Sequence, residues 1–335
     1  MIDLRNNVTL YQASKAKRKP NILVTSILFI LVISIGQMIG SMVSGAVIAI
    51  TSMENMQVHF SDLQSGAISI DEFTTMLIEA NPRGIVFAML LGTLVTILLS
   101  VFVARVIEKR PMRSIGFKGE TFFRDYLIGF LLGALAIALV GGVALAIGAM
   151  RFENMSAATP WGWLVLFLLG FLIQGLSEEV ALRGYYMVSL KNRASTAVAI
   201  GLSSLVFAAL HLMNSGITAI SFVNLVLFAV FAGIYFFKTD SIWGIAAFHS
   251  AWNFVQGNVL GILVSGIQID ATIFKLIPVE GQELFSGGAF GLEGGLIVTL
   301  LCVILIVIML WLPQKPRPEI VGESNELVTE TPPVE

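Results

Sequence analysis

The chain has 335 residues, of which 56% are hydrophobic and only 13% are charged, and its mean hydropathy is +0.87. Soluble globular domains carry roughly 25% charged residues, so this composition excludes that class and indicates an integral membrane protein. The net charge of -2 offers no basic surface for nucleic acid, which we exclude as a partner. The single cysteine, Cys302, excludes an intrachain disulfide.

Hydrophobic segments of ~20 residues, the length that crosses a bilayer as a helix, recur along the whole chain. They predict an all-α integral membrane protein with about eight transmembrane helices. The segments are 22–50, 84–106, 126–149, 161–182, 194–212, 217–237, 241–261 and 289–312.

The positions of lysine and arginine predict the orientation, because loops on the cytoplasmic side of a membrane carry an excess of these residues. With the N-terminus in the cytoplasm, the basic residues gather in the inner loops. Only Arg83, Arg151 and Lys275 then fall in outer loops. We therefore predict a multi-pass protein of the cell membrane, of the bacterial plasma membrane type, with both termini in the cytoplasm.

Polar residues at membrane depth are concentrated between positions 178 and 253. A charge at this depth costs at least ~2.5 kcal/mol unless it is paired or lines a polar cavity. Glu179 and Arg183 are four residues apart in the favourable order, which predicts an ion pair between them. Glu178 lies ~100° away around the same helix, so it is free to face a cavity.

Two chemical interpretations fit these residues together with His211 on the fifth segment and with His249 and Asn253 on the seventh. In the first, Glu178 and His211 hold and deprotonate a water. His249 and Asn253 then donate hydrogen bonds to the developing oxyanion. In the second, Glu178, His211 and His249 are the three protein ligands of a divalent metal such as zinc. Both predict hydrolysis within the membrane, with one metal ion as the cofactor or with none.

Each residue also has a structural explanation when it is taken alone. A histidine on an apolar face is commonly a satisfied core residue, and an asparagine in a membrane helix commonly joins two helices by hydrogen bonds. The ion pair could likewise serve only to hold helices together. The gathering of all these residues in one stretch of the chain favours a shared site.

Three short motifs carry a resemblance to a known family. EEVALR, FAALH and HSAWN match the patterns E-E-x-x-x-R, F-x-x-x-H and H-x-x-x-N in this order, whereas H-E-x-x-H, G-x-S-G and G-x-G-D do not occur. The region of about 161–258 resembles the CPBP family of intramembrane proteases, named for CAAX proteases and bacteriocin processing and also called Abi. The type II CAAX prenyl endopeptidases are its eukaryotic relatives.

The resemblance implies roles for the motif residues. Glu178 would be the general base, and His211 would help to hold the water. His249 and Asn253 would form the oxyanion site, while Glu179 and Arg183 would support the motif. The implied catalytic set is Glu178, Glu179, Arg183, His211, His249 and Asn253.

These motifs would lie at different depths in straight, upright helices. We therefore expect the fourth helix to extend beyond the bilayer, with 184–193 at its surface, and the fifth and seventh helices to be tilted or staggered. The predicted active site lies in a bundle formed by helices four, five and seven, around a cavity that opens toward the cytoplasm.

The chain divides into five predicted regions. In the outer loop at 51–83, Ser69 and Glu72 have capping-box spacing, which predicts a short amphipathic helix on the membrane surface. The regions are a cytoplasmic segment at 1–20, helices one to three at 21–160, a catalytic core at 161–261, an outer loop and the last helix at 262–312, and a disordered cytoplasmic tail at 313–335.

The predicted function is that of an intramembrane endopeptidase that cleaves a membrane-associated peptide or protein. CAAX-type processing and bacteriocin maturation or self-immunity are the substrate classes that the resemblance implies. The alternative is a non-catalytic membrane scaffold with the same fold. A proton-coupled transporter is disfavoured, because the chain shows no internal repeat. The oligomeric state is not predicted.

Overall fold

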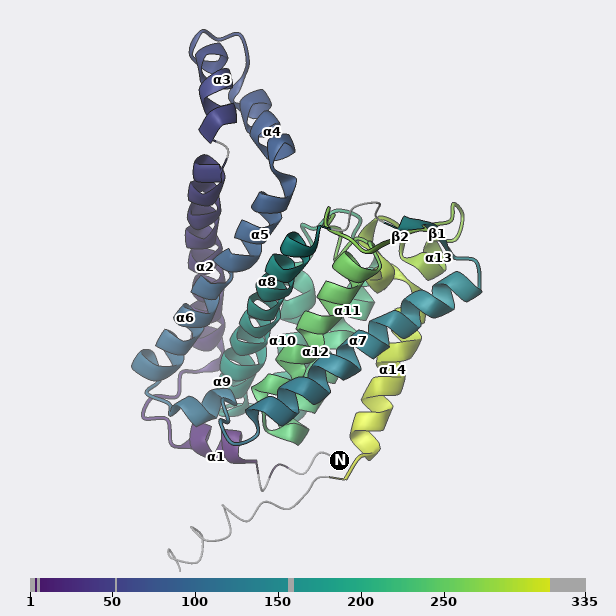
Figure 1. Cartoon of the computed structure of the whole chain (residues 1–335). Helices are drawn as coiled ribbons and strands as arrows, with labels where there is room; N and C mark the ends of the chain where they lie inside the picture. The colour runs from purple at the N-terminus through teal and green to yellow at the C-terminus, as the bar shows by residue number, and fades with distance from the viewer. Residues whose placement is uncertain (1–3, 5–6, 52, 156–159, 314–335) are drawn as a thin grey trace, which may run out of the picture.

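The computed structural model describes residues 4, 7–51, 53–155 and 160–313, and this part of the chain is almost wholly helical (Figure 1). The predicted disordered tail lies outside the described residues from position 314 onward. The helices of the first half are α1 Val8–Ser14, α2 Ile22–Thr51, α3 Met53–Gln64, α4 Ile70–Ala80, α5 Pro82–Gly92, α6 Leu94–Phe102 and α7 Phe122–Ala146.

The second half contains the helices that surround the motifs. They are α8 Trp161–Glu179, α9 Val188–Lys191, α10 Thr196–Leu210, α11 Ala219–Thr239, α12 Ile242–Phe254, α13 Glu283–Ser286 and α14 Leu296–Trp311. Three π-helical turns continue α6, α8 and α12, at Val103–Ile107, Val180–Met187 and Val255–Val259. Short 3-10 turns lie at Met112–Ile115, Gly288–Phe290 and Leu292–Gly294.

The helices support a multi-pass membrane protein, as predicted. Among the described residues, five helical stretches are long and apolar enough to cross a bilayer, whereas α10 and α14 are apolar but shorter. The five are Ile22–Val47, Pro82–Ile107, Phe122–Ala146, Trp161–Lys191 and Ala219–Thr239. Every predicted segment is largely helical, but the number of about eight crossings stays a prediction.

The centre of the bundle is α12, which packs against α7, α8 and α11 and is buried almost throughout. Glycines allow α7 to approach it closely. A Cβ atom at Gly129 would collide with the carbonyl oxygen of Gly244, and one at Gly133 would collide with that of Phe248. The opposite face of α7 exposes large apolar side chains such as Leu135, as expected for a surface that contacts lipid.

A hairpin of α2 with α5 and α6, which we call the arm, stands beside the bundle, and α3 and α4 lie beyond its end (Figure 1). The helix predicted within residues 51–83 is confirmed as α4. Its capping box is formed, because the amide of Ser69 donates to Glu72 at 2.8 Å and the amide of Glu72 donates to the Ser69 hydroxyl at 3.1 Å. The location of α4 on a membrane surface stays a prediction.

A small sheet departs from the all-α prediction. Strands β1 Met150–Met155 and β2 Phe274–Pro278 pair antiparallel, with Met150 opposite Pro278 and an irregularity between Phe152 and Asn154. The strands come from the loops that follow α7 and α12, both of which the sequence places on the outer side. Loop backbone groups need hydrogen-bond partners, and pairing the two loops supplies them.

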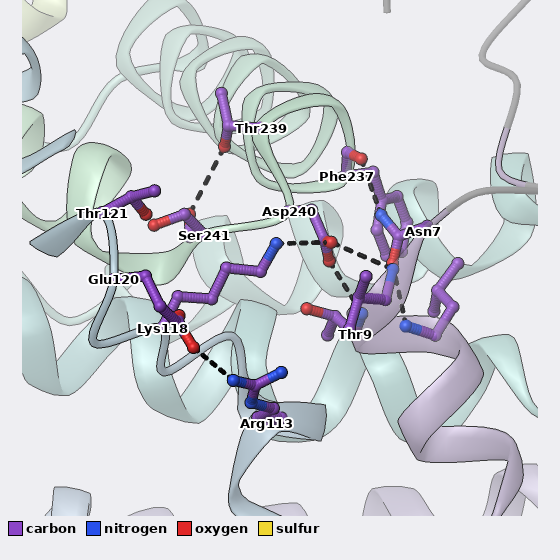
Figure 2. Close-up of polar contacts among 12 residues, drawn as sticks. Asn7, Thr9, Arg113, Lys118, Glu120, Thr121, Phe237, Thr239, Asp240 and Ser241 are labelled. Carbon is purple, nitrogen blue, oxygen red and sulfur yellow. Dashed lines mark hydrogen bonds and ion pairs between the residues drawn. The ribbon is translucent and has the colours of Figure 1, made fainter. Parts of the chain in front are cut away.

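Helix α1 packs at the opposite end of the bundle, within the segment that the sequence predicts only as cytoplasmic. Asp240 ends α11 in a left-handed conformation with φ of 57°. Its carboxylate accepts the amides of Val8 and Thr9 at 2.9 and 2.8 Å and pairs with Lys118 at 2.7 Å. Figure 2 shows Lys118 and the first turn of α1 converging on this residue. The short N-terminal helix is thus docked on the turn that precedes α12.

Candidate active site

A cavity of ≈ 330 Å³ lies between the arm and the bundle. One wall comes from α2, α5 and α6, and the other comes from α8, α10, α11 and α12, with further contacts from the loop at 264–269 and from Glu293. Four predicted site residues line this cavity, namely Glu178, His211, His249 and Asn253. The structure therefore brings the three motifs together, although the cavity also uses the arm, α11 and a later loop.

Behind the cavity, Arg183, Glu179 and His249 form a continuous polar chain. The predicted ion pair is present, with Arg183 Nη1 at 3.1 Å from Glu179 Oε1, and the two side chains are only 1% and 0% exposed. The same carboxylate oxygen also accepts a hydrogen bond of 2.9 Å from His249 Nδ1. Since a carboxylate accepts but does not donate here, His249 carries its proton on Nδ1, and Glu179 fixes the direction of the ring.

Glu178 is the glutamate that faces the cavity, as predicted. Gln174 Nε2 donates to its Oε1 at 2.7 Å, and Gln174 Oε1 accepts from Asn253 Nδ2 at 3.0 Å. Glu178 Oε2 lies 3.8 Å from His249 Nε2 and has no hydrogen-bond partner among the described residues. Gln174 therefore links the general-base candidate to the asparagine of the third motif.

His211 stands on a different wall of the cavity. It follows the last residue of α10, and its Nδ1 donates to the carbonyl oxygen of Phe207 at 2.8 Å. It makes no hydrogen bond with Glu178 in the described structure. Because the carbonyl fixes the proton on Nδ1, the neutral ring presents Nε2 as an acceptor.

Aromatic side chains hold the charged chain in place. The ring of Phe228 packs edge-on against His249 with centroids 5.2 Å apart, and the guanidinium of Arg183 lies 5.0 Å from the ring centre of Phe207. Such contacts stabilise a cation that is buried away from water.

The helical geometry changes directly after the glutamate pair. Glu179 is the last residue of α8, and Arg183 lies within the π-helical turn at Val180–Met187. Irregular turns of this kind occur frequently at functional sites. Residues 184–190, expected at the bilayer surface, are buried in protein, because α1 and the 3-10 turn at Met112–Ile115 pack near them.

The residues as placed do not fit a three-ligand zinc site. No group of three or more His, Cys, Asp or Glu side chains within the described part of the chain is positioned to hold a metal ion. The Nδ1 atoms of His211 and His249 are both engaged, which leaves only their Nε2 atoms for ligation.

Residues 159–255 match the family model described as Type II CAAX prenyl endopeptidase Rce1-like. This region is similar to the CAAX protease family. The match spans the three motifs, confirms the resemblance to the CPBP family, and indicates an intramembrane protease of the CAAX type. Neither the curated proteins nor the solved structures that were compared gave a match.

The matched region supplies only part of the cavity. It holds α8, α10, α11 and α12, but the arm and Glu293 lie outside it. Sequence reasoning missed both Gln174 and Glu293. Gln174 was recognisable as a polar residue one helical turn before Glu178, whereas Glu293 stands alone in the loop GLEGG, where no spacing connects it to a motif.

Proposed function

We propose that the protein is an intramembrane endopeptidase in which Glu178 activates a water to hydrolyse a peptide bond of a membrane-associated protein or peptide. The position of Glu178 carries this proposal. Gln174 satisfies one of its oxygens, while the other has no hydrogen-bond partner among the described residues and lies 3.8 Å from His249 Nε2. Two acceptor or donor groups at this separation can contact the same water.

The proposed reaction uses the groups that line the cavity. Glu178 accepts a proton from the water as the water oxygen attacks the scissile carbonyl carbon, and His211 Nε2 helps to orient that water. Nε2–H of a protonated His249 and Nδ2–H of Asn253 donate to the carbonyl oxygen as it becomes negative. Glu178 then gives its proton to the leaving nitrogen, the C–N bond breaks, and a carboxylic acid and an amine are released.

Glu179 and Arg183 act behind the reacting atoms. The Glu179 carboxylate on Nδ1 favours the protonated ring of His249, which would donate to the oxyanion. Arg183 in turn compensates the charge of Glu179 in a region from which water is excluded. Both are thus proposed as positioning residues.

The alternative chemistry is a divalent metal such as zinc held by Glu178, His211 and His249, which would polarise the substrate carbonyl and lower the pKa of a bound water. The donor geometry supports the metal-free route. Purified protein that keeps full cleavage activity after dialysis against EDTA and 1,10-phenanthroline would agree with that route. Loss of activity that added Zn²⁺ restores would require the metal.

We also propose the surroundings of the reaction. The protein would lie in a bacterial plasma membrane, with about eight crossings, both termini in the cytoplasm and the cavity open to that side. Its substrates would be of the kind handled in CAAX-type processing or in bacteriocin maturation and self-immunity. If the following experiment finds no cleavage that depends on Glu178, it supports the alternative of a non-catalytic membrane scaffold.

The deciding experiment compares new peptide termini in membranes of cells that lack the protein, complemented with wild type, with Glu178→Gln or with Glu283→Gln at matched abundance. Glu283 is an exposed carboxylate in α13 and serves as the control. We expect termini that occur with wild type and Glu283→Gln but not with Glu178→Gln. Identical termini and an equally restored phenotype for all three proteins would instead establish the scaffold.

A further inference from the structure

The cavity carries acidic groups but no permanent cation. Its ionisable lining residues are Glu178, His211, His249 and Glu293, and no lysine or arginine of the described chain lines it. Arg183 lies behind this surface and is already paired with Glu179. A ligand that enters therefore meets two carboxyl groups, one of which the proposed hydrolysis does not use.

That unused group is Glu293, and its orientation is fixed. Its Oε2 accepts hydrogen bonds from the amide and the hydroxyl of Ser265 at 2.6 and 2.8 Å, with Gln256 Nε2 at 3.4 Å. Asn224 Nδ2 binds the Glu293 carbonyl oxygen at 2.8 Å and so holds the backbone. Within the described chain, Oε1 of Glu293 has no hydrogen-bond partner, and no lysine or arginine pairs with this carboxyl group.

Such a group calls for a cation from outside the chain. A carboxylate withdrawn from water is stable in its charged form only when hydrogen bonds and an opposite charge compensate for the lost hydration. Ser265 supplies two hydrogen bonds, and the nearby imidazole of His249 is already bound to Glu179. No lysine or arginine of the described chain lines the cavity. An ammonium or guanidinium group of a ligand would complete the environment of Glu293.

We propose that Glu293 is a specificity residue that selects substrates with a lysine or arginine side chain close to the scissile bond. This inference rests on the proposed function and names its substrate class. The preferred substrate is therefore a membrane-associated chain with a basic side chain beside the scissile bond.

Binding and cleavage are to be measured separately. The full-length Glu178→Gln protein in nanodiscs is mixed with labelled apolar peptides of 16 residues that carry one central lysine, glutamine or glutamate and an amidated C-terminus. We expect the lysine peptide to bind about ten-fold more tightly than the glutamine peptide. Adding Glu293→Gln should remove this preference, whereas adding Glu283→Gln should preserve it.

Each outcome has a defined meaning. Equal binding of the three charge types, binding of none of them, or a preference that survives Glu293→Gln overturns the specificity proposal. Thermal unfolding and size-exclusion profiles check that the variants are folded. Glutamine is chosen at position 293 because its amide oxygen can still accept the Ser265 hydrogen bonds. If charge-selective binding is found but wild type cleaves no peptide, the proposed hydrolysis fails while the cation site stands.

Discussion

Replacing Glu179 by leucine should destabilise the protein strongly, because it leaves Arg183 buried without its counter-ion. After the change, Arg183 keeps a 3.4 Å contact with the carbonyl oxygen of Ala229, the ring of Phe207 at 5.0 Å and the more distant charge of Glu178. Breaking one side of a buried ion pair costs about 3–5 kcal/mol. Since ~1.4 kcal/mol is a factor of ten, the unfolding equilibrium should shift by roughly two to four orders of magnitude.

The double variant Glu179→Leu/Arg183→Leu separates stability from function. Removing both charges leaves no unpaired ion, so its free energy of unfolding should return to within about 1 kcal/mol of wild type or exceed it. Cleavage should still be lost, because His249 Nδ1 no longer has the acceptor that it binds at 2.9 Å in the wild-type structure. Stability would thus recover while activity would not.

The assay is reversible unfolding in detergent, followed by measurement of cleavage for each variant. The control is Glu153→Leu, which breaks the exposed pair of Glu153 with Lys275 at 2.7 Å and should cost less than ~1 kcal/mol. The reasoning is refuted if Glu179→Leu costs no more than this control, or if the double variant is as unstable as the single one.

Three further predictions concern the helical framework around the site. Gly133→Ala should push α7 away from α12 and so lower both the unfolding temperature and the rate of substrate cleavage. Gly142→Ala in the same helix is the control, because its Cβ atom meets no atom within 4 Å and should change neither quantity. The capping hydrogen bonds hold the pKa of Glu72 below its usual value of 4.5. The stability that they add to α4 is therefore fully present above pH 4.5 and is lost as the pH falls through the lowered pKa. Amide hydrogen exchange at the start of α4 should therefore differ between wild type and Glu72→Gln at pH 7 but converge at strongly acidic pH. In Asp240→Asn, the new side chain tolerates the left-handed backbone but binds the amides of α1 more weakly. Trypsin should therefore cut next to Lys15 faster than in wild type. An unchanged cleavage rate would contradict the role of Asp240 in docking α1.

The sequence revealed the parts of the site that depend on local geometry. The Glu179–Arg183 pair follows from helical spacing alone, and so does the turning of Glu178 toward a cavity. Hydrophobic length likewise predicted where the helices are. Each of these features involves neighbours on a single helix or a strongly apolar run.

Features that depend on how helices meet were not predictable in this way. Nothing in the spacing shows that the His249 ring turns toward Glu179, because that contact joins residues 70 positions apart. The strands β1 and β2 were missed because each gains its hydrogen bonds only from the other. Glu293 was missed because it owes its position to Ser265, a residue of another loop.

The arm forms a wall of the cavity that lies outside residues 159–255, the part of the chain that matches the family. The motif residues and the opposite wall of the cavity are therefore encoded in separate stretches of the gene. Relatives can keep the glutamates and histidines while replacing Val86, Met89 or Thr93 on the opposite wall. Shared motifs will consequently be a better guide to the reaction of a homologue than to the peptide that it cuts, and exchanging arms between homologues offers a route to altered selectivity.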